Sequence, residues 1–259
     1  MSRNSFDTQI ILLEEHMPPF QKIDMLHLQK TGVVNKDIAV STESPLTICI
    51  NNDLFDQIMR TPGDEKALVT GLLFSNKLLF FFKELTHFTL TTTQHGDTVH
   101  IQIQQKRDNT SFENACIHSN QLHPQKITLT DIQSCIDALS DYQPIRTITR
   151  STHAAILFDS DLKPIAAKED VGRHNALDKV IGQALIDNML DRAYILVLSS
   201  RVSHELMAKV INTPVKCIFS VSRPTSLAID IARKYNISLV CLSKGDGVFI
   251  FSCKGRFDV

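Results

Sequence analysis

The second half of the chain alternates short apolar runs with longer amphipathic stretches, and this rhythm constrains the fold more than any other feature. The run YILVL at 194–198 has the length and composition of a buried strand, whereas apolar residues recur at helical spacing between 176 and 189. We expect the same alternation around them: strands at 153–159, 164–168, 215–219, 238–242 and 248–252, and helices at 203–211 and 226–235. Such an alternation predicts an α/β domain with a largely parallel sheet and helices on both faces.

The first half of the chain has a weaker pattern that indicates an α+β arrangement. Strands are expected at 44–50 and 54–59, a hairpin at 87–93 and 98–104, and helices at 64–76 and 127–139. Residues 105–125 are polar and lack periodicity, which is typical of a long functional loop. We therefore predict a smaller N-terminal α+β domain at 24–145, including this loop, and a C-terminal domain at 146–259, so that the chain is α+β overall.

Composition and charge narrow the classes of function. The 259 residues are 43% hydrophobic and 21% charged, as in ordinary globular proteins, and the formal net charge is -1. This balance gives no indication of nucleic-acid binding, so no nucleic-acid partner is expected. The apolar run at 78–82 is far too short to span a membrane, and the N-terminal residues lack the apolar core of a signal peptide. We expect a cytoplasmic protein without a membrane partner.

Six cysteines are present, and none forms a C-x-x-C pair. The sequence therefore lacks both zinc-ligand spacing and a disulfide framework. Four cysteines lie in predicted strands or helices, where we expect small buried side chains: Cys49, Cys135, Cys217 and Cys241. Cys116 differs because its neighbours Asn114, His118 and Ser119 are polar.

Four loops follow predicted strands, and in open α/β sheets ligands bind beyond the carboxyl ends of the strands. The loops at 169–175, 199–203, 220–225 and 243–247 each carry one basic residue, namely Arg173, Arg201, Arg223 and Lys244. Backbone N–H groups at helix N-termini add further affinity for anions. Together the four loops predict a site for a phosphate-rich ligand. The alternative is that they are ordinary connections in which serines cap helices.

The loop at 169–175 concentrates polar residues where a helix begins. Gly172 permits a tight turn, and Arg173 and His174 lie at the predicted helix start. His174 and Asp178 are four residues apart, so their side chains can meet on one face of the helix. A helix N-terminus disfavours imidazolium, which predicts a neutral, hydrogen-bonding His174. The alternative is a capped helix that carries surface charges.

Residues 169–182, EDVGRHNALDKVIG, resemble the signature of the formate dehydrogenase accessory sulfurtransferase family of sulfur carrier proteins. Further segments resemble the family in the same order: 59–73 (MRTPGDEKALVTGLL), 153–159 (HAAILFD), 200–201 with 203–206 (SR and SHEL) and 220–232 (SVSRPTSLAIDIA). The resemblance covers residues 43–252. It implies a cytidine-deaminase-like, three-layer C-terminal domain with a mixed sheet.

The sequence lacks the zinc-binding motifs of deaminases with that fold, H-x-E and P-C-x-x-C. His174-Asn175-Ala176 has no glutamate, and the segment PVKC at 214–217 has no cysteine pair. The resemblance therefore implies a deaminase architecture without protein-bound zinc and without deaminase activity.

The resemblance implies a sulfurtransferase that works through a cysteine persulfide. Family members accept sulfur from a cysteine desulfurase and pass it to the molybdenum of the bis(molybdopterin guanine dinucleotide) cofactor, which formate dehydrogenase requires. The family's C-G-x-C carrier motif corresponds to residues 116–119, so Cys116 is the expected catalytic residue and His118 can help to ionise it. Ser119 replaces the second cysteine, and Ile117 replaces the glycine.

Two alternatives follow from this departure from the family motif. If Ser111 instead occupies the motif position, the loop has no catalytic cysteine. If the broken cysteine pair prevents transfer, the chain is a non-catalytic chaperone that binds the molybdenum cofactor or a guanine nucleotide.

The family's cofactor-binding stretch, F-x-R-x-x-R, corresponds to Leu242, Ser243, Lys244, Gly245, Asp246 and Gly247. Lys244 keeps a positive charge for phosphate, although as a point charge, whereas Gly247 replaces the second arginine. From their loop positions, we add Arg173, His174 and Arg201 as candidate contacts to phosphate or base. The resemblance also implies a homodimer, with a cysteine desulfurase and formate dehydrogenase as protein partners.

Overall fold

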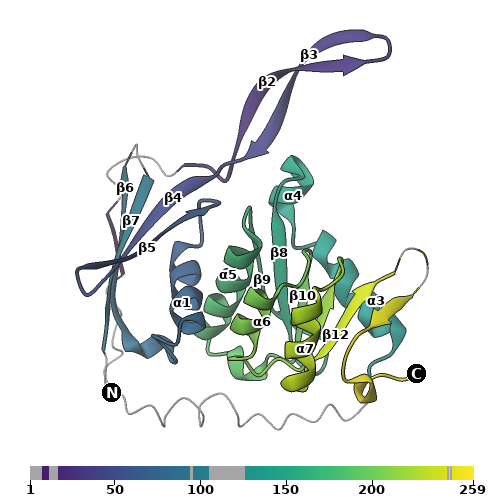
Figure 1. Cartoon of the computed structure of the whole chain (residues 1–259). Coiled ribbons are helices and arrows are strands. Elements are labelled where there is room, and N and C mark those ends of the chain that lie inside the picture. The colour runs from purple at the N-terminus through teal and green to yellow at the C-terminus, as the bar shows by residue number, and fades with distance from the viewer. Residues whose placement is uncertain (1–7, 12–16, 94–95, 105–125, 244, 246) are drawn as a thin grey trace.

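Two β-sheets enclose a layer of helices, and a two-stranded arm projects from one end of the molecule (Figure 1). The computed structural model describes residues 8–11, 17–93, 96–104, 126–243, 245 and 247–259. The strands are β1 (Thr8–Ile11), β2 (Phe20–Gln29), β3 (Gly32–Ser41), β4 (Ser44–Ile50), β5 (Asp53–Arg60), β6 (Leu85–Thr93), β7 (Gly96–Ile103), β8 (His153–Phe158), β9 (Pro164–Asp170), β10 (Ile195–Leu198), β11 (Cys217–Ser220), β12 (Ser238–Leu242) and β13 (Val248–Ile250).

Five of the six described α-helices match segments that the sequence predicts as helical, whereas α4 was not predicted. The helices are α1 (Glu65–Ser75), α3 (Leu129–Asp137), α4 (Pro144–Thr149), α5 (Arg173–Ile186), α6 (His204–Val210) and α7 (Ser226–Lys234). Short 3₁₀ turns lie at Phe82–Glu84, Ala138–Ser140, Leu190–Arg192 and Lys254–Arg256. In the part of the chain that the structure describes, no helix combines the length and the apolar character needed to cross a membrane.

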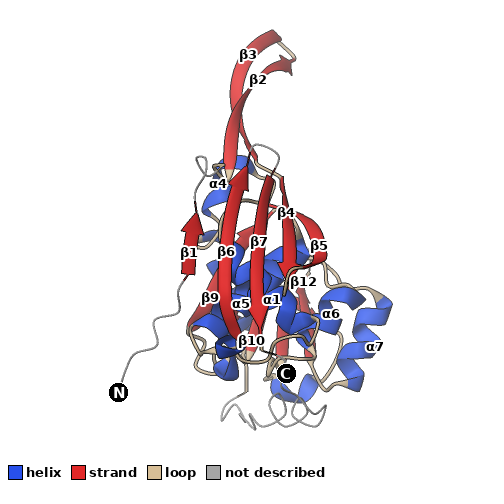
Figure 2. Ribbon diagram, turned by 90° about the vertical axis from the view of Figure 1, so that its left-hand side faces the viewer, coloured by secondary structure: helices blue, strands red, loops and turns tan. Residues whose placement is uncertain are grey.

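The N-terminal sheet has the strand order β1-β6-β7-β4-β5. Its central hairpin, β6 with β7, is the one predicted at 87–104, and β4 pairs parallel with β7 and antiparallel with β5. One face is apolar because alternate residues such as Leu46 and Ile48 of β4, with Val99 and Ile101 of β7, are buried. Figure 2 shows this sheet in front of α1 and α5, which cover that apolar face.

The C-terminal sheet has the strand order β13-β12-β11-β10-β8-β9 and is mixed. Strands β10, β11 and β12 are parallel, whereas β8 is antiparallel to both β9 and β10. The prediction of a largely parallel sheet was therefore wrong for β8 and β13, which are antiparallel to their neighbours, whereas the α/β class and the mixed sheet implied by the resemblance are confirmed. Helix α3 covers one face, and α5, α6 and α7 cover the other. The closer likeness to cytidine deaminases stays a prediction from the resemblance.

The direction of β8 decides which strand ends lie at the same edge of this sheet. Because β8 is antiparallel to both neighbours, β9 and β10 run in the same direction as β11 and β12. The carboxyl ends of these four strands therefore lie at the same edge as the first residue of β8, His153, which pairs with Asp170 at the end of β9.

Helices α1 and α5 join the two sheets through a contact that requires glycine on both helices. A Cβ atom on Gly71 would lie 1.8 Å from the carbonyl oxygen of Asp178, and one on Gly182 would lie 1.9 Å from the carbonyl oxygen of Ala67. The helix backbones touch at these points, and the apolar residues of both sheets form one continuous cluster around them. The division into domains at residue 145 stays a prediction.

The arm consists of β2 and β3, which pair from Phe20–Ser41 at the base to Gln29–Gly32 at the tip. The sequence analysis did not predict it. Its apolar side chains are exposed near the tip, with Leu28 79% exposed. At the base, the hydroxyl of Ser41 lies 2.7 Å from that of Ser151. The arm thus rises from the same end of the molecule as α4 (Figure 1).

Candidate functional site

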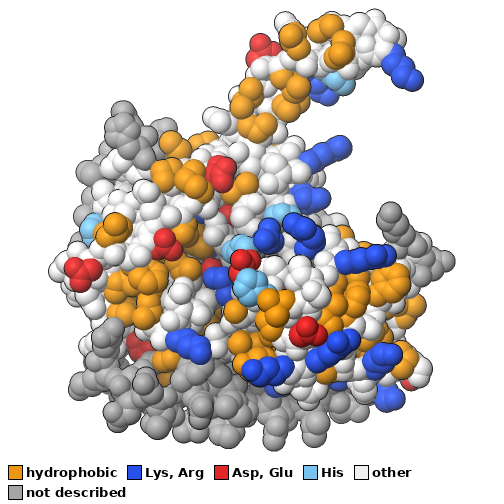
Figure 3. Space-filling view, viewed as in Figure 1, with side chains coloured by type: hydrophobic (Ala, Val, Ile, Leu, Met, Phe, Trp, Pro, Cys, Tyr) orange, Lys and Arg blue, Asp and Glu red, His pale blue; other side chains and the backbone are white. Residues whose placement is uncertain are grey.

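The four predicted basic loops all leave the C-terminal sheet at the edge where β8 begins. Arg173 and His174 start α5 directly after β9, and Arg201 lies in the loop between β10 and α6. Figure 3 shows Lys, Arg and His side chains gathered at this end of the molecule, below the arm. Lys244 and Cys116 lie outside the described residues, so their predicted roles stay predictions.

A buried ion pair fixes the turn that leads into α5. The Nζ atom of Lys179 lies 2.8 Å from Oδ2 of Asp170, and both side chains are almost fully buried. Lys179 also donates to the carbonyl oxygen of Thr61, 2.9 Å away. Asp170 accepts from the backbone N–H groups of Thr61 and Gly172. Much of the charge in the 168–182 segment is therefore structural, because it holds the start of α5 against the N-terminal half of the chain.

Glu169 positions the beginning of α4 in a similar way. Its buried carboxylate accepts from the backbone N–H groups of Ile145 and Arg146, at 2.8 and 3.0 Å, and from the hydroxyl of Thr152 at 2.7 Å. Arg146 donates in turn to the carbonyl oxygen of Thr152. This network brings α4 to the same sheet edge as Arg173, which the sequence analysis did not anticipate.

His174 and Asp178 do not pair with each other, contrary to the expectation from their spacing. The Nε2 atom of His174 lies 3.3 Å from the carboxylate of Glu205, whereas Nζ of Lys209 lies 2.7 Å from that of Asp178. Glu205 and Lys209 are four residues apart on α6, so one face of α6 supplies both partners. Burial raises the pKa of Asp178, and the Lys209 ammonium opposes this shift.

We call the edge of the C-terminal sheet where β8 begins and α5 starts the rim. Two histidines at the rim have lowered pKa values. Burial lowers the pKa of His153, and the guanidinium groups of Arg146 and Arg173 lower it further. Burial also lowers the pKa of His174, and Arg173 is the next largest cause. Both rings are therefore neutral at neutral pH. The positive charge of the rim comes from its arginines, and Arg173 lies close enough to act on both imidazoles.

Arg173 is an unusual first residue for a helix because its charge adds to the positive end of the helix dipole. The preceding residue, Gly172, offers no side chain to cap the helix. The Nε atom of Arg173 is buried and has no hydrogen-bond partner among the described residues. A buried donor without a partner costs free energy, and an anion in front of α5 would satisfy it.

The loop between β12 and β13 contains the predicted cofactor-binding stretch. Leu242 packs against the apolar cluster under α3, so its side chain serves the core. Ser243 closes the turn, because its backbone N–H and its hydroxyl both donate to the carbonyl oxygen of Gly247, at 3.2 and 3.1 Å. Gly245 and Gly247 have φ values of 98° and 102°, which favour glycine. Asp246 lies outside the described residues.

The other two basic loops differ in how their arginines are used. The guanidinium of Arg223 lies 5.2 Å from the centre of the Phe249 ring and so packs against β13. Arg201 is exposed. Its side chain is therefore accessible to a ligand at the rim.

Three of the described cysteines are poorly suited to carry sulfur. Cys135, Cys217 and Cys241 are buried, and burial raises the pKa of the first two to about 12. Since the thiolate is the nucleophile, these thiols are unreactive at neutral pH. Cys49 is only half-buried, so the expectation that it is buried was wrong. Within the described ranges, no three Asp, Glu, His or Cys side chains gather in a way that could hold a metal ion.

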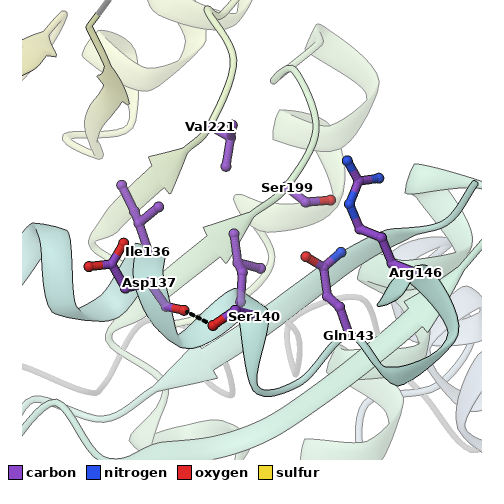
Figure 4. Close-up of a pocket in the computed structure, with 8 residues that line it drawn as sticks. Ile136, Asp137, Ser140, Gln143, Arg146, Ser199 and Val221 are labelled. Carbon is purple, nitrogen blue, oxygen red and sulfur yellow. Dashed lines mark hydrogen bonds between the residues drawn. The ribbon is translucent and has the colours of Figure 1, made fainter. Parts of the chain in front are cut away.

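A cavity of about 400 Å³ opens beside the rim, on the face of the sheet that α3 covers (Figure 4). It is lined by Ile136, Asp137, Leu139, Ser140, Gln143, Arg146, Ser199 and Val221. The sequence analysis missed these residues as site residues, although the predicted loops at 199–203 and 220–225 include two of them, Ser199 and Val221. No local pattern could have found Gln143, because the fold brings it to the sheet edge from outside any periodic segment.

Comparison with known proteins identifies the family. The sequence model of the FdhD/NarQ family matches residues 41–258 of the chain. The chain belongs to the FdhD/NarQ family. It is 30% identical over 254 residues to the sulfur carrier protein FdhD of Sulfurisphaera tokodaii. The aligned region covers 91% of this chain and 98% of the relative. It is 31% identical over 217 residues to the FdhD of Bacillus subtilis, covering 77% and 82% of the two chains.

A solved structure shows the same fold. It comes from a Desulfotalea psychrophila protein described as a formate dehydrogenase accessory protein. The TM-score is 0.75 at 21% identity, over 93% of this chain and all of the other. The family resemblance seen in the 169–182 segment is confirmed by the family match over residues 41–258 and by the FdhD relatives.

Proposed function

We propose that this member of the FdhD/NarQ family accepts sulfur as a persulfide from a cysteine desulfurase and transfers it to the molybdenum of bis(molybdopterin guanine dinucleotide), for use by formate dehydrogenase. The single observation that carries the substrate class is the buried, unpartnered Nε of Arg173 at the uncapped start of α5. This donor would be satisfied by an anion, and the phosphates of a guanine dinucleotide would supply one.

The first chemical step is a thiol–persulfide exchange on Cys116. Its thiolate attacks the outer sulfur of the desulfurase persulfide, so that a new S–S bond forms on Cys116 while the old one breaks. The desulfurase cysteine leaves as a thiolate. No external oxidant or reductant is needed, because the outer sulfur keeps its oxidation state.

In the second step the outer sulfur moves from Cys116 to a Mo(IV) centre of the substrate. The metal's electron pair reduces the sulfur to sulfide as Mo(VI)=S forms, and Cys116 returns as a thiolate. Arg173 and Arg201 hold the phosphates during this step, and Lys244 adds a further charge. The neutral rings of His153 and His174 leave the arginines as the rim's main charges.

The test is to incubate the protein with a cysteine desulfurase and cysteine and to measure its intact mass. We expect the mass of one added sulfur atom on the wild-type chain and on Cys253→Ala, which removes a half-buried thiol near the C-terminal end of the chain. Cys116→Ala should take up no sulfur. Uptake by Cys116→Ala equal to that of the wild type would contradict the assignment of Cys116.

A second candidate function is favoured by Ser119, which stands where the family motif has its second cysteine. Without that thiol, the chain would bind the cofactor or a guanine nucleotide as a chaperone and would transfer no sulfur. The two functions differ in one result of the same experiment. A wild-type chain that binds guanine nucleotide but gains no sulfur supports the chaperone.

A further inference from the structure

Two histidine side chains lie beside the proposed anion site. His153 is the first residue of β8, and His174 is the second residue of α5, directly after Arg173. Both side chains are half-buried, so each ring lies between protein and solvent. Figure 3 shows His side chains beside those of Lys and Arg at this end of the molecule. The charge on these two rings therefore affects any anion held in front of α5.

The neighbours of His153 disfavour a further positive charge. Burial lowers the pKa of His153, and Arg146 of α4 and Arg173 of α5 lower it further. On the β10 side, Nδ1 of the ring lies 3.4 Å from the hydroxyl of Ser199, which brings no charge. The buried carboxylate of Glu169 is already engaged by hydrogen bonds from α4 and from the residue before β8. In the described part of the chain, no carboxylate therefore pairs with His153.

The surroundings of His174 are mixed. Its Nε2 atom lies 3.3 Å from the carboxylate of Glu205 on α6, whereas Lys209 on the same helix pairs with Asp178. Burial and Arg173 nevertheless lower the pKa of His174. Although the contact with Glu205 is close, Nε2 is a buried atom without a hydrogen-bond partner among the described residues, as is Nε of Arg173. Two neighbouring side chains at the start of α5 thus each present an unused nitrogen.

An anion in front of α5 would reverse the balance of charge around both rings. A negative charge within about 4–6 Å of an imidazole favours its protonated form. An anion that satisfies Nε of Arg173 also offsets the guanidinium charge that acts on His153 and on His174. Since binding and protonation at one site are linked, an anion that favours the protonated rings is itself bound more tightly when they are protonated.

We propose that anion binding at the rim is coupled to proton uptake by His153 and His174. The coupling rests on the proposed function, because it requires an anionic ligand in front of α5. In the ligand-free chain the two rings are uncharged at neutral pH, and in the complex they add positive charge to that of the arginines. The site therefore holds its ligand most tightly at mildly acidic pH and releases it more readily as the pH rises.

The direction of the pH dependence follows from the two states of each ring. The pKa values of His153 and His174 are lowered in the ligand-free chain, and a bound anion raises them. Between the lower and the higher value, the complex holds more protons than the free chain. Affinity therefore increases as the pH falls through that window and is lost again as the pH rises through it.

The test is calorimetric titration of the full chain with sulfate, at constant ionic strength, between about pH 8 and about pH 6, the range that brackets histidine titration. Sulfate stays a dianion throughout, so only the protein changes its charge. One proton taken up per anion changes affinity about tenfold per pH unit, so we expect wild-type affinity to rise at least about tenfold across the range. Binding enthalpies in buffers of different ionisation enthalpy measure the proton uptake directly.

Three variants assign the protons to residues. His153→Gln and His174→Gln should each lose part of the proton uptake, and the double variant should lose most of it. At about pH 8, where the rings are uncharged, the double variant should bind sulfate nearly as the wild type does. The matched control is His100→Gln, at an exposed histidine on β7 of the N-terminal sheet, which should keep the full pH dependence.

The outcomes separate the coupling from the proposed function. If the wild type binds sulfate without proton uptake, or if the double variant keeps the wild-type pH profile, the coupling is wrong while the anion site stands. If the wild type does not bind sulfate at any pH, the anion site of the proposed function and the coupling both fail. Because the enthalpy measurement uses the wild-type chain, it tests the coupling even if a variant does not fold.

Discussion

The polar groups on the inner side of α5 and those at the rim differ in whether they have hydrogen-bond or ion-pair partners. Inside, Lys179 pairs with Asp170 at 2.8 Å, and Asp178 pairs with Lys209 at 2.7 Å. At the rim, the Nε of Arg173 has no partner among the described residues, and the same holds for the Nε2 of Gln143. The paired groups in the interior therefore stabilise the fold, whereas we assign the unpaired groups at the rim to ligand binding.

This difference explains why one segment, 168–182, contains so much charge in a chain with a net charge of -1. Its carboxylates and Lys179 tie α5 to β9, α4 and the residues before α1, which leaves Arg173 in a fixed position. Substitutions inside should therefore lower the free energy of unfolding. Substitutions at the rim should lower ligand affinity and leave stability almost unchanged.

The largest expected effect is that of Lys179→Met. Removing one partner of a buried pair leaves the Asp170 carboxylate without its counter-ion, which costs about 3–5 kcal/mol of unfolding free energy. Urea unfolding followed by circular dichroism measures this change. Lys163→Met, at an exposed lysine in the turn between β8 and β9, should change stability by less than about 0.5 kcal/mol. Equal stability of the two variants would contradict a structural role for the pair.

The next largest effect is expected for Gly182→Ala. The added Cβ would lie 1.9 Å from the carbonyl oxygen of Ala67, so α1 and α5 must move apart. Overpacking of this kind costs about 1–3 kcal/mol. The matched control is Gly255→Ala, where a Cβ meets nothing within 4 Å and the thermal midpoint should hardly change. A thermal midpoint for Gly182→Ala equal to that of the control would show that the helix contact is not tight.

The sequence predicted the fold best where the apolar pattern is strongest. The apolar run at 194–198 coincides with β10, and the apolar stripe at 176–189 coincides with most of α5. The antiparallel direction of β8 could not be predicted, because local apolar spacing does not depend on the direction of a strand's neighbours. The arm of β2 and β3 was missed because its apolar residues do not alternate regularly with polar ones, and both faces near its tip are exposed.

The candidate site was predictable only in part, for a related reason. Arg173, His174 and Arg201 follow strands in sequence, so their place at the sheet edge could be inferred from loop position. Gln143 and Arg146 reach that edge through α4, which Glu169 holds by hydrogen bonds across more than twenty residues of sequence. Such long-range contacts leave no local pattern.

The smallest predicted effect concerns pH. The pKa values of His153 and His174 are lowered in the folded chain, mainly by burial, so the unfolded chain binds more protons as the pH falls towards and below about 6.5. Stability should therefore decrease as the pH falls through that window. The decrease should be shallower in the double variant His153→Gln and His174→Gln, measured by urea unfolding between about pH 7.5 and 5.5. An identical slope in both proteins would contradict the shifted pKa values.

The most direct test of the difference between interior and rim is to measure pyrophosphate affinity and unfolding free energy together for Arg173→Ala. We expect affinity to fall about ten- to a hundredfold, since a hydrogen bond to a charged group contributes about 1.5–3 kcal/mol, while stability changes by less than about 0.5 kcal/mol. Lys216→Ala, which removes a charge at the opposite edge of the sheet, should keep wild-type affinity. Unchanged pyrophosphate affinity in Arg173→Ala, or a large loss of its stability, would contradict the assignment of the rim to a ligand.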